Sequence, residues 1–294
     1  MALTLSDVLQ AGYAELGQLN VSLATGGSTT TITDTTQTDG DDDAWKDGAA
    51  FVVNTTDGLS PIGQFQRVSA YVAATGVLTV DTAFSTAIGA GDTYGLVGSY
   101  YPLRQMIKSV NDALRSLGDV DLTDTTTLDT AVATTEYAAS ATWKRAAPFR
   151  VDIQGITGSS STDNSWRVIQ DWEYVPAVAG SAGKIIFRDY QPASRDIRVW
   201  YKGPHPTLAA YSDVVAEIHD PEIVVHAFVA KALEWQNTRS QGADQFLLQR
   251  GQKAEQKLAN LMVERPRQRV RRKPRLLIVD RGMPFDQGDD FTVG

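Results

Sequence analysis

The sequence predicts an α+β protein: a helical bundle assembled from segments distant in the chain, with two inserted antiparallel β modules and an extended C-terminal arm. Three observations predict this fold. Apolar residues recur with helical spacing in three separated regions, the regions between them alternate short β-prone runs with turn residues, and the C-terminus is basic and contains prolines. The predicted parts are bundle helices within 1–19, 101–119 and 207–263, a small β-barrel or sandwich at 20–100, a second β-rich insertion at 120–206 and the arm at 264–294.

The N-terminal segment has the signals of a helix start. Thr4 can cap the helix, and Asp7 stands three residues later as the acid of a capping box. Leu3 and Val8 flank the cap as a hydrophobic staple, and Gly17 marks an end nearby. A helix this short needs a partner, which we expect to be the rest of the bundle.

Three further helices are predicted. Pro102 favours a helix start, the apolar residues from Leu103 to Leu117 repeat along one face, and Gly118 ends the pattern. Asp220-Pro221-Glu222 combines a cap, a proline and an early acid. The helix it starts, 221–236, is apolar on most of its circumference, so we expect burial on more than one side. The last helix is predicted at 243–263.

The two insertions are predicted from short β-prone runs between turn signals. Ala74-Thr75-Gly76 is expected to join two strands of the first insertion as a tight hairpin. The strands expected in the first insertion are 28–33, 49–53, 66–73, 77–80 and 93–97. Those expected in the second are 136–142, 149–156, 166–175, 184–188 and 196–202.

Composition excludes several kinds of chemistry. The chain has no cysteine and three histidines, which excludes disulfide scaffolds, thiolate metal sites and cysteine nucleophiles. No apolar stretch is long enough for a transmembrane helix, and the N-terminus lacks the basic region of a signal peptide. We therefore expect no membrane partner.

The motifs that could carry catalysis or bind metal fail in their details. Gly180–Ile185 lacks the glycine spacing and the Ser or Thr of a phosphate-binding loop. His219 and His226 are separated by a helix start, and Asp39–Asp43 lacks the alternating spacing of a calcium loop, so a solvated turn is favoured there. No catalytic, cofactor-binding or metal-binding residue is predicted, and an enzyme is the least supported class.

An aromatic group in the second insertion offers another interpretation, a platform on which sugars or bases stack. Trp166 and Trp172 would share a face if they lie on one unbroken strand. Packing in the core of the β module is the favoured interpretation. The group consists of Trp166, Trp172, Trp200, Tyr174, Tyr190 and Tyr201.

Charge is distributed unevenly along the chain. The net charge is −8, but residues 265–281 contain eight bases and one acid, which leaves −15 on the rest. This segment could bind nucleic-acid phosphates, dock on an acidic partner, or remain a solvated tail. The apolar run beside the bases favours a docking arm, because such a run can add as a strand to a sheet edge. The arm residues are Arg265, Arg267, Arg269, Arg271, Arg272, Lys273, Arg275, Leu276, Leu277, Ile278 and Val279.

In this organisation the chain resembles the head–tail connector (adaptor, or head-completion) proteins of tailed bacteriophages. The resemblance rests on Tyr101–Ile107 continuing through Asn111–Arg115, on the Asp220-Pro221-Glu222 helix ending near Leu233–Gln236, and on the C-terminal arm. The first insertion also resembles modules that recur in phage structural proteins, through Gly26–Thr31, Asp43-Ala44-Trp45, Gly76–Val80 and Gly91–Tyr94.

The resemblance implies a virion structural protein located at the head–tail junction and made in the cytoplasm of the host bacterium. Its copies, commonly twelve, would form a ring under the portal that extends the DNA channel and provides the docking surface for the tail. The expected partners are further copies of the chain, the portal protein, and the tail or next neck protein. DNA would pass through the lumen without specific binding, and no cofactor is implied.

Particular residues can be assigned to these roles. One side of the helix 221–236 would face a neighbouring subunit, as a heterologous ring interface requires, through Val224, Phe228, Lys231 and Trp235. The acidic body would repel DNA, and the basic arm would clasp the portal. The alternatives are a tail nozzle, tail-tip or fibre-anchoring protein, a DNA-binding module that acts through the arm, and a glycan-binding protein that uses the aromatic group.

Overall fold

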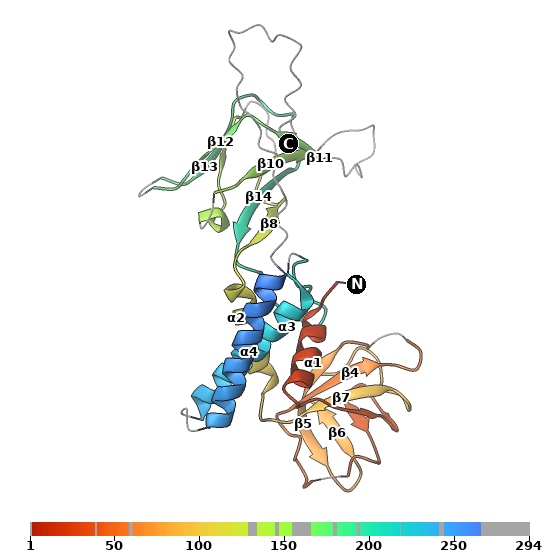
Figure 1. The fold of residues 1–294 in the computed structure, drawn as a ribbon. Coiled ribbons are helices and arrows are strands. Elements are labelled where there is room, and N and C mark those ends of the chain that lie inside the picture. The colour runs from red at the N-terminus through yellow and green to blue at the C-terminus, as the bar shows by residue number, and fades with distance from the viewer. Residues whose placement is uncertain are drawn as a thin grey trace, which may run out of the picture.

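The computed structural model of the chain combines four α-helices with antiparallel sheets. It describes residues 2–38, 40–58, 61–128, 134–144, 147–154, 166–178, 181–192, 195–217, 219–240 and 244–265. Figure 1 shows the helices gathered in a central bundle, with the first β module (residues 20–100) packed beside it and the second β module (residues 120–206) beyond one end of it. The predicted α+β class is confirmed.

The bundle contains α1 (Leu5–Glu15), α2 (Leu103–Ser116), α3 (Pro221–Arg239) and α4 (Gln245–Glu264). α3 is the central helix, since it contacts each of the other three. Its apolar circumference is covered by these neighbours, as the sequence predicts for a helix without a polar face. The bundle therefore forms from segments on both sides of each β module.

Local signals determine where the helices begin. Thr4 and Asp7 form the predicted capping box, with the Asp7 carboxylate accepting from the Thr4 N–H at 2.9 Å. Asp220 caps α3 by accepting from the Glu222 N–H at 2.9 Å, and Pro221 is the first residue of that helix. Pro102 differs from expectation, because it occupies the capping position before α2.

The first β module is a seven-stranded sheet in the order β1-β7-β4-β5-β6-β3-β2. β1 and β2, at opposite ends of this order, are successive segments of the chain. The Ala24 N–H donates to Asp92 O, and the Thr25 N–H donates to Thr33 O, so the chain passes from one end of the sheet to the other. The sheet thus closes into a small barrel. Its strands are β1 (Asn20–Leu23), β2 (Gly26–Gly27), β3 (Thr31–Thr33), β4 (Ala49–Asn54), β5 (Phe65–Val72), β6 (Val77–Val80) and β7 (Thr93–Val97).

Alternate residues of this barrel belong to two different cores. Ala50 and Val52 of β4 point into the barrel, whereas Ala49 and Phe51 belong to the core of the helical bundle. The Phe51 ring meets Tyr13 of α1 edge-on, with the ring centroids 5.7 Å apart. The first β module is therefore fixed to the bundle by a shared core.

The second β module has a core of its own, formed between two sheets with the orders β11-β10-β14-β8 and β12-β13-β9. The predicted single strand at 166–175 is wrong, because the chain bends at Gln170–Asp171 and its two halves enter different sheets. The elements are β8 (Val120–Asp124), β9 (Glu136–Ala138), a 3-10 turn at Ala141–Lys144, β10 (Arg150–Gln154), β11 (Trp166–Ile169), β12 (Trp172–Val175), β13 (Lys184–Phe187) and β14 (Ile197–Gly203).

The chain returning from the second β module is hydrogen-bonded to the bundle. Asn111 of α2 donates to Leu208 O at 2.9 Å and accepts from the Leu208 N–H at 2.7 Å. Further along, the Leu5 N–H donates to Asp213 O and the Val215 N–H donates to Leu3 O, both at 2.8 Å. The segment 207–217 therefore lies against α2 and against the start of α1 before it enters α3.

Candidate docking surfaces

Two of the four residues assigned to a subunit interface are buried inside this chain. Val224 and Phe228 of α3 have no exposed surface and belong to the bundle core. Phe228 lies against Gly12 of α1, where an added Cβ would be 2.1 Å from its Cε1 atom. The expectation that Val224 and Phe228 face a neighbouring subunit is therefore corrected: they hold α3 against α1 and the rest of the bundle.

The other two residues of that set remain partly accessible. Lys231 forms an ion pair with Glu234 at 2.7 Å. Trp235 is half-buried against the bundle core, and the Arg239 guanidinium lies 5.6 Å from its ring centroid. These two side chains are close enough along α3 to belong to one surface, about one turn apart.

The predicted arm begins at a defined place on the bundle. Arg265, directly after α4, forms ion pairs through Nη1 with Glu222 Oε2 at 2.7 Å and with Asp220 Oδ1 at 3.3 Å. Both acids belong to the N-terminal end of α3, where negative charge is favoured by the helix dipole. The remaining arm residues, Arg267 to Val279, lie outside the described residues.

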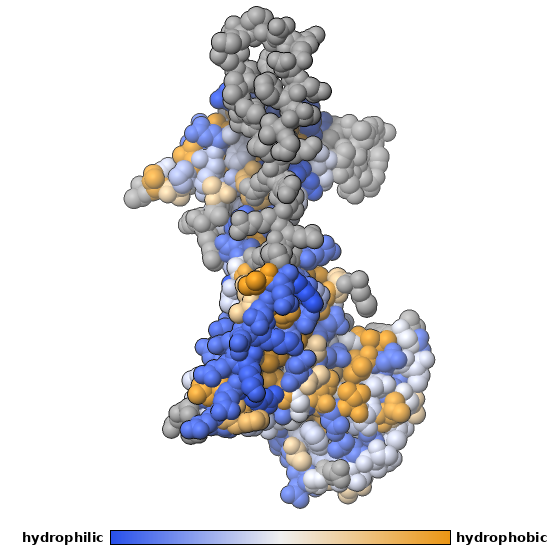
Figure 2. Space-filling view, in the orientation of Figure 1, coloured by the Kyte–Doolittle hydropathy of each residue, from blue (hydrophilic) through white to orange (hydrophobic). Residues whose placement is uncertain are grey.

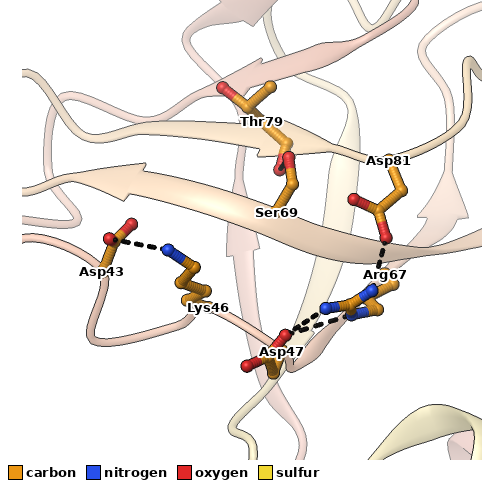
Figure 3. Close-up of polar contacts among 7 residues, drawn as sticks. All are labelled: Asp43, Lys46, Asp47, Arg67, Ser69, Thr79 and Asp81. Atoms are coloured by element: carbon orange, nitrogen blue, oxygen red, sulfur yellow. Dashed lines mark hydrogen bonds and ion pairs between the residues drawn. The ribbon is translucent and has the colours of Figure 1, made fainter.

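The first β module carries the largest net negative charge of any part of the chain. Residues 20–100 contain nine aspartates, no glutamate and two bases, a net charge of −7. Both bases are already paired, as Figure 3 shows: Lys46 with Asp43 at 3.2 Å, and Arg67 with Asp47 and Asp81. The sequence analysis identified an acidic body without assigning it to a module, although the predicted bounds 20–100 give the same count.

The aspartate run at 39–43 has a structural role. Asp42 accepts from the Ala73 N–H at 2.9 Å, and Asp43 accepts from the Tyr71 N–H at 3.2 Å, so two carboxylates hold their loop against β5. The hydrogen bond from Tyr71 and the nearby Lys46 lower the pKa of Asp43. Asp39 lies outside the described residues. Across the described ranges, no group of three or more His, Cys, Asp or Glu side chains is placed to hold a metal ion.

β1 is the strand at one end of the sheet order of the first β module. Within the described chain its one sheet neighbour is β7. Val21 and Leu23, two residues apart on the same face, are 53% and 59% exposed. The sequence analysis missed this strand, because the four residues Asn20–Leu23 are too few to show a clear alternation of polar and apolar residues.

The aromatic group of the second β module is divided between its two sheets. Trp166 and Trp200 lie on the outer face of the sheet that contains β10 and β14, whereas Trp172 and Tyr174 pack against the inner core. The Arg198 guanidinium lies 4.3 Å from the Trp166 ring centroid and 5.1 Å from that of Trp200. The Arg198 guanidinium therefore lies over the rings of both tryptophans, where a sugar would have to stack. This contact weakens the interpretation of the aromatic group as a sugar platform.

A buried carboxylate organises this stack. Asp152 has no exposed surface and accepts from Arg198 Nη2 at 2.9 Å, from Arg150 Nε at 2.7 Å and from Trp200 Nε1 at 2.8 Å. Burial opposes ionisation of Asp152, but the three donors outweigh it and lower its pKa. The arrangement satisfies the carboxylate within the fold, as expected for a structural network.

All three histidines are buried: His205 and His219 lie in the chain that leads into α3, and His226 lies within α3 itself. His205 accepts from the Ala216 N–H at 2.9 Å, and its ring centroid lies 5.9 Å from that of His219. His226 lies inside the bundle, where burial and then Lys257 lower its pKa. The motif at Gly180–Ile185 falls partly outside the described residues, and its Lys184 pairs with Glu136 at 2.8 Å. None of these contacts aligns a nucleophile with a base.

The molecular surface separates polar from apolar regions. Figure 2 shows a mainly hydrophilic strip over α4 and hydrophobic side chains gathered over the part of the first β module next to α1. None of the helices in the described ranges has both the length and the apolar composition needed to cross a membrane. No protein-family model matches this sequence. No curated protein is significantly similar to it.

Proposed function

We propose that the chain is a virion structural protein, a head–tail adaptor whose copies form a ring under the portal, extend the DNA channel and offer a docking surface to the tail. One arrangement carries the proposal: a single bundle holds a β module fixed against its side, holds a second β module at its end, and leads through α4 into a basic segment. Separate modules on one rigid support suit a subunit that must contact several neighbours at once.

Charge supports the same assignment. The first β module carries −7, and the basic residues that could attract DNA are concentrated in the segment after α4. An acidic surface repels the phosphate backbone, so DNA can pass along it without being held. The proposed place of the protein is accordingly the head–tail junction of a virion, with the portal as the partner of the basic arm.

The ring interface is proposed at surfaces other than the centre of α3. Lys231 and Trp235 keep accessible surface on that helix and remain candidates, whereas Val224 and Phe228 do not. A heterologous ring needs two different surfaces on each subunit. We propose that the surface around Lys231 and Trp235 is one of the two.

The experiment is capture of the full chain by immobilised portal protein from the same phage, compared with a DNA gel-shift assay. We expect capture by the portal, and weak DNA binding that disappears as salt rises. The test variant replaces Arg267, Arg269 and Arg271 by Gln and should be captured less. The control replaces Arg104 and Arg115 of α2 by Gln and should be captured like the wild type.

Two other outcomes would favour the alternative functions. A chain that does not bind the portal but binds DNA tightly would favour the DNA-binding module. A sixfold or threefold assembly that binds fibres would favour a tail-tip protein.

A further inference from the structure

We propose that the contact between His205 and Ala216 is a pH-sensitive lock between the second β module and the helical bundle. The neutral imidazole closes this lock, and protonation opens it. The lock determines how rigidly the second module is held at the end of the bundle. It goes beyond the proposed function, because it concerns movement within one subunit and holds or fails whether or not the chain forms a ring.

The second β module is joined to the bundle through a narrow neck. Val120 of β8 and Gly203 of β14 are paired at the ends of their strands, and Figure 1 shows both strands leading to the end of the bundle. Among the described residues, the core of this module is separate from the core of the bundle, whereas the first β module shares the bundle core. The position of the second module therefore depends on contacts made just beyond the neck.

His205 lies two residues beyond this neck and connects it to the chain just before α3. Its Nε2 atom accepts from the Ala216 N–H at 2.9 Å. The neighbouring Val215 N–H donates to Leu3 O at 2.8 Å, so this part of the chain is held on the bundle. The prolines on both sides of His205 have no N–H to donate and little freedom in φ. The imidazole thus joins a stiff segment to residues that the bundle holds in place.

The two ring nitrogens of His205 identify its neutral form. Nδ1 lies 2.7 Å from Pro206 O, and a carbonyl oxygen only accepts, so Nδ1 carries the hydrogen. Nε2 accepts from the Ala216 N–H and therefore carries none. A proton added at Nε2 would direct one N–H at another, and this hydrogen bond would be lost. His205 is 4% exposed, so water does not replace the lost partner while the lock stays closed.

The surroundings of His205 do not compensate an added positive charge. The ring centroid of His219 lies 5.9 Å away, so a proton on each ring would produce repulsion. In the described chain no acid forms an ion pair with His205: Asp112 pairs with Arg115, Asp121 with Lys202, and Asp220 with Arg265. The charged side chains on the elements around it are Asp7 at the start of α1, Asp112 and Arg115 of α2, Asp121 and Lys202 at the neck, and Asp213, Glu217 and Asp220 before α3.

The sign of the pH dependence follows from these contacts. At neutral and basic pH the uncharged imidazole accepts from Ala216, and the lock is closed. As the pH falls through the range in which histidine takes up a proton, the hydrogen bond is lost and the lock opens. The second β module then keeps its own core but tilts more freely on its neck.

The first test measures hydrogen exchange of the Ala216 amide in the full-length chain, corrected for the intrinsic effect of pH on exchange. We expect its protection in the wild type to fall about tenfold or more between about pH 8 and about pH 5. The Leu208 amide donates to Asn111 Oδ1 and not to a histidine, so it should keep its protection. Equal loss at both amides would indicate general loosening and would overturn the lock.

Three variants separate the lock from other effects of pH. His205→Gln offers a side-chain oxygen in place of Nε2 and has no titrating group, so Ala216 should stay protected at both pH values. His205→Leu removes the acceptor and should leave Ala216 poorly protected at both. His226→Gln, the control at another buried histidine, should behave like the wild type. The proposal fails if the wild type keeps Ala216 protected at about pH 5, or if His205→Gln loses protection as the wild type does.

The second test measures the movement itself. The natural chain has no cysteine, so spin labels can be attached at Lys108→Cys on α2 and Glu173→Cys on β12, which are exposed positions. Pulsed electron paramagnetic resonance should give a broader distance distribution at about pH 5 than at about pH 8, and His205→Gln should remove the difference. A label pair within the bundle, Lys108→Cys with Lys253→Cys, should give one distribution at both pH values. A distribution between 108 and 173 that does not change, or that broadens equally in His205→Gln, contradicts the proposal.

Discussion

The side-chain amide of Asn111 forms hydrogen bonds with both backbone groups of Leu208, 97 residues further along the chain. This pair joins α2 to the chain that returns from the second β module. Asn111 is 6% exposed, so water cannot replace the two bonds when the side chain is removed. The contact makes the bundle continuous across an insertion of more than eighty residues.

The first prediction concerns this pair. Asn111→Ala lowers the free energy of unfolding by about 2–3 kcal/mol, because it leaves a buried N–H and a buried carbonyl without partners. Ser116→Ala, which removes a local hydrogen bond to Ala113 O on the same helix, should cost less than about 1 kcal/mol. Urea denaturation followed by circular dichroism measures both. If Asn111→Ala and Ser116→Ala lowered the free energy of unfolding equally, the contact with Leu208 would not be what holds the two segments together.

A second prediction compares two helical glycines. Gly12→Ala destabilises the protein by about 1–3 kcal/mol, because the new Cβ would overlap the Phe228 ring of α3. Gly251→Ala in α4 stabilises it by up to about 1 kcal/mol, since its nearest neighbour is a Leu233 atom 4.0 Å away and alanine favours a helix. Thermal denaturation should therefore show a lower melting temperature than the wild type for Gly12→Ala and a higher one for Gly251→Ala. A stabilising Gly12→Ala would show that α1 and α3 do not pack as closely as described.

The third prediction addresses Asp152. Asp152→Ala removes the acceptor shared by Arg150, Arg198 and Trp200, leaves their donors unpaired, and costs about 3–5 kcal/mol in the second β module. Asp121→Ala, which removes only a surface partner of Lys202, should cost less than about 1 kcal/mol. Tryptophan fluorescence reports mainly on the second module, which contains four of the six tryptophans of the chain. Unchanged fluorescence and stability in Asp152→Ala would refute the role of the network.

The fourth prediction is a pH dependence with a definite sign. Burial, and then Lys257, lower the pKa of His226 below its ordinary value of 6.5. The unfolded chain therefore takes up a proton near pH 6.5 that the folded chain takes up only at lower pH, so stability falls as the pH drops below 6.5. Substituting His226→Gln should flatten this part of the stability–pH curve. The same slope in wild type and variant would place the titrating group elsewhere.

Local signals in the sequence predicted the helices well. The Thr4–Asp7 capping box and the Asp220-Pro221-Glu222 start are contacts between neighbouring residues, so the sequence contains both partners. The strands Val77–Val80 and Thr93–Val97 were predicted at their observed bounds, since turns flank both. β1 and β8 were missed, because each has exposed or polar residues and becomes a strand only through its neighbours in the sheet.

Long-range relationships could not be predicted in the same way. An apolar circumference shows that α3 is buried but not what buries it, and the covering helices belong to this chain, which is why Val224 and Phe228 were assigned to the wrong contact. The break between Trp166 and Trp172 has no glycine or proline to mark it. The acidic character of the first β module, by contrast, can be counted from the sequence with the predicted bounds 20–100.

The proposed function is tested most directly by measuring the mass and symmetry of the chain bound to its portal, by mass photometry and negative-stain microscopy of the mixture. The account predicts particles that carry a closed ring of this protein on one end of the portal, with the portal's own symmetry and twelve copies where that symmetry is twelvefold. Unchanged portal particles beside free monomers, at concentrations where both proteins are folded, would contradict it.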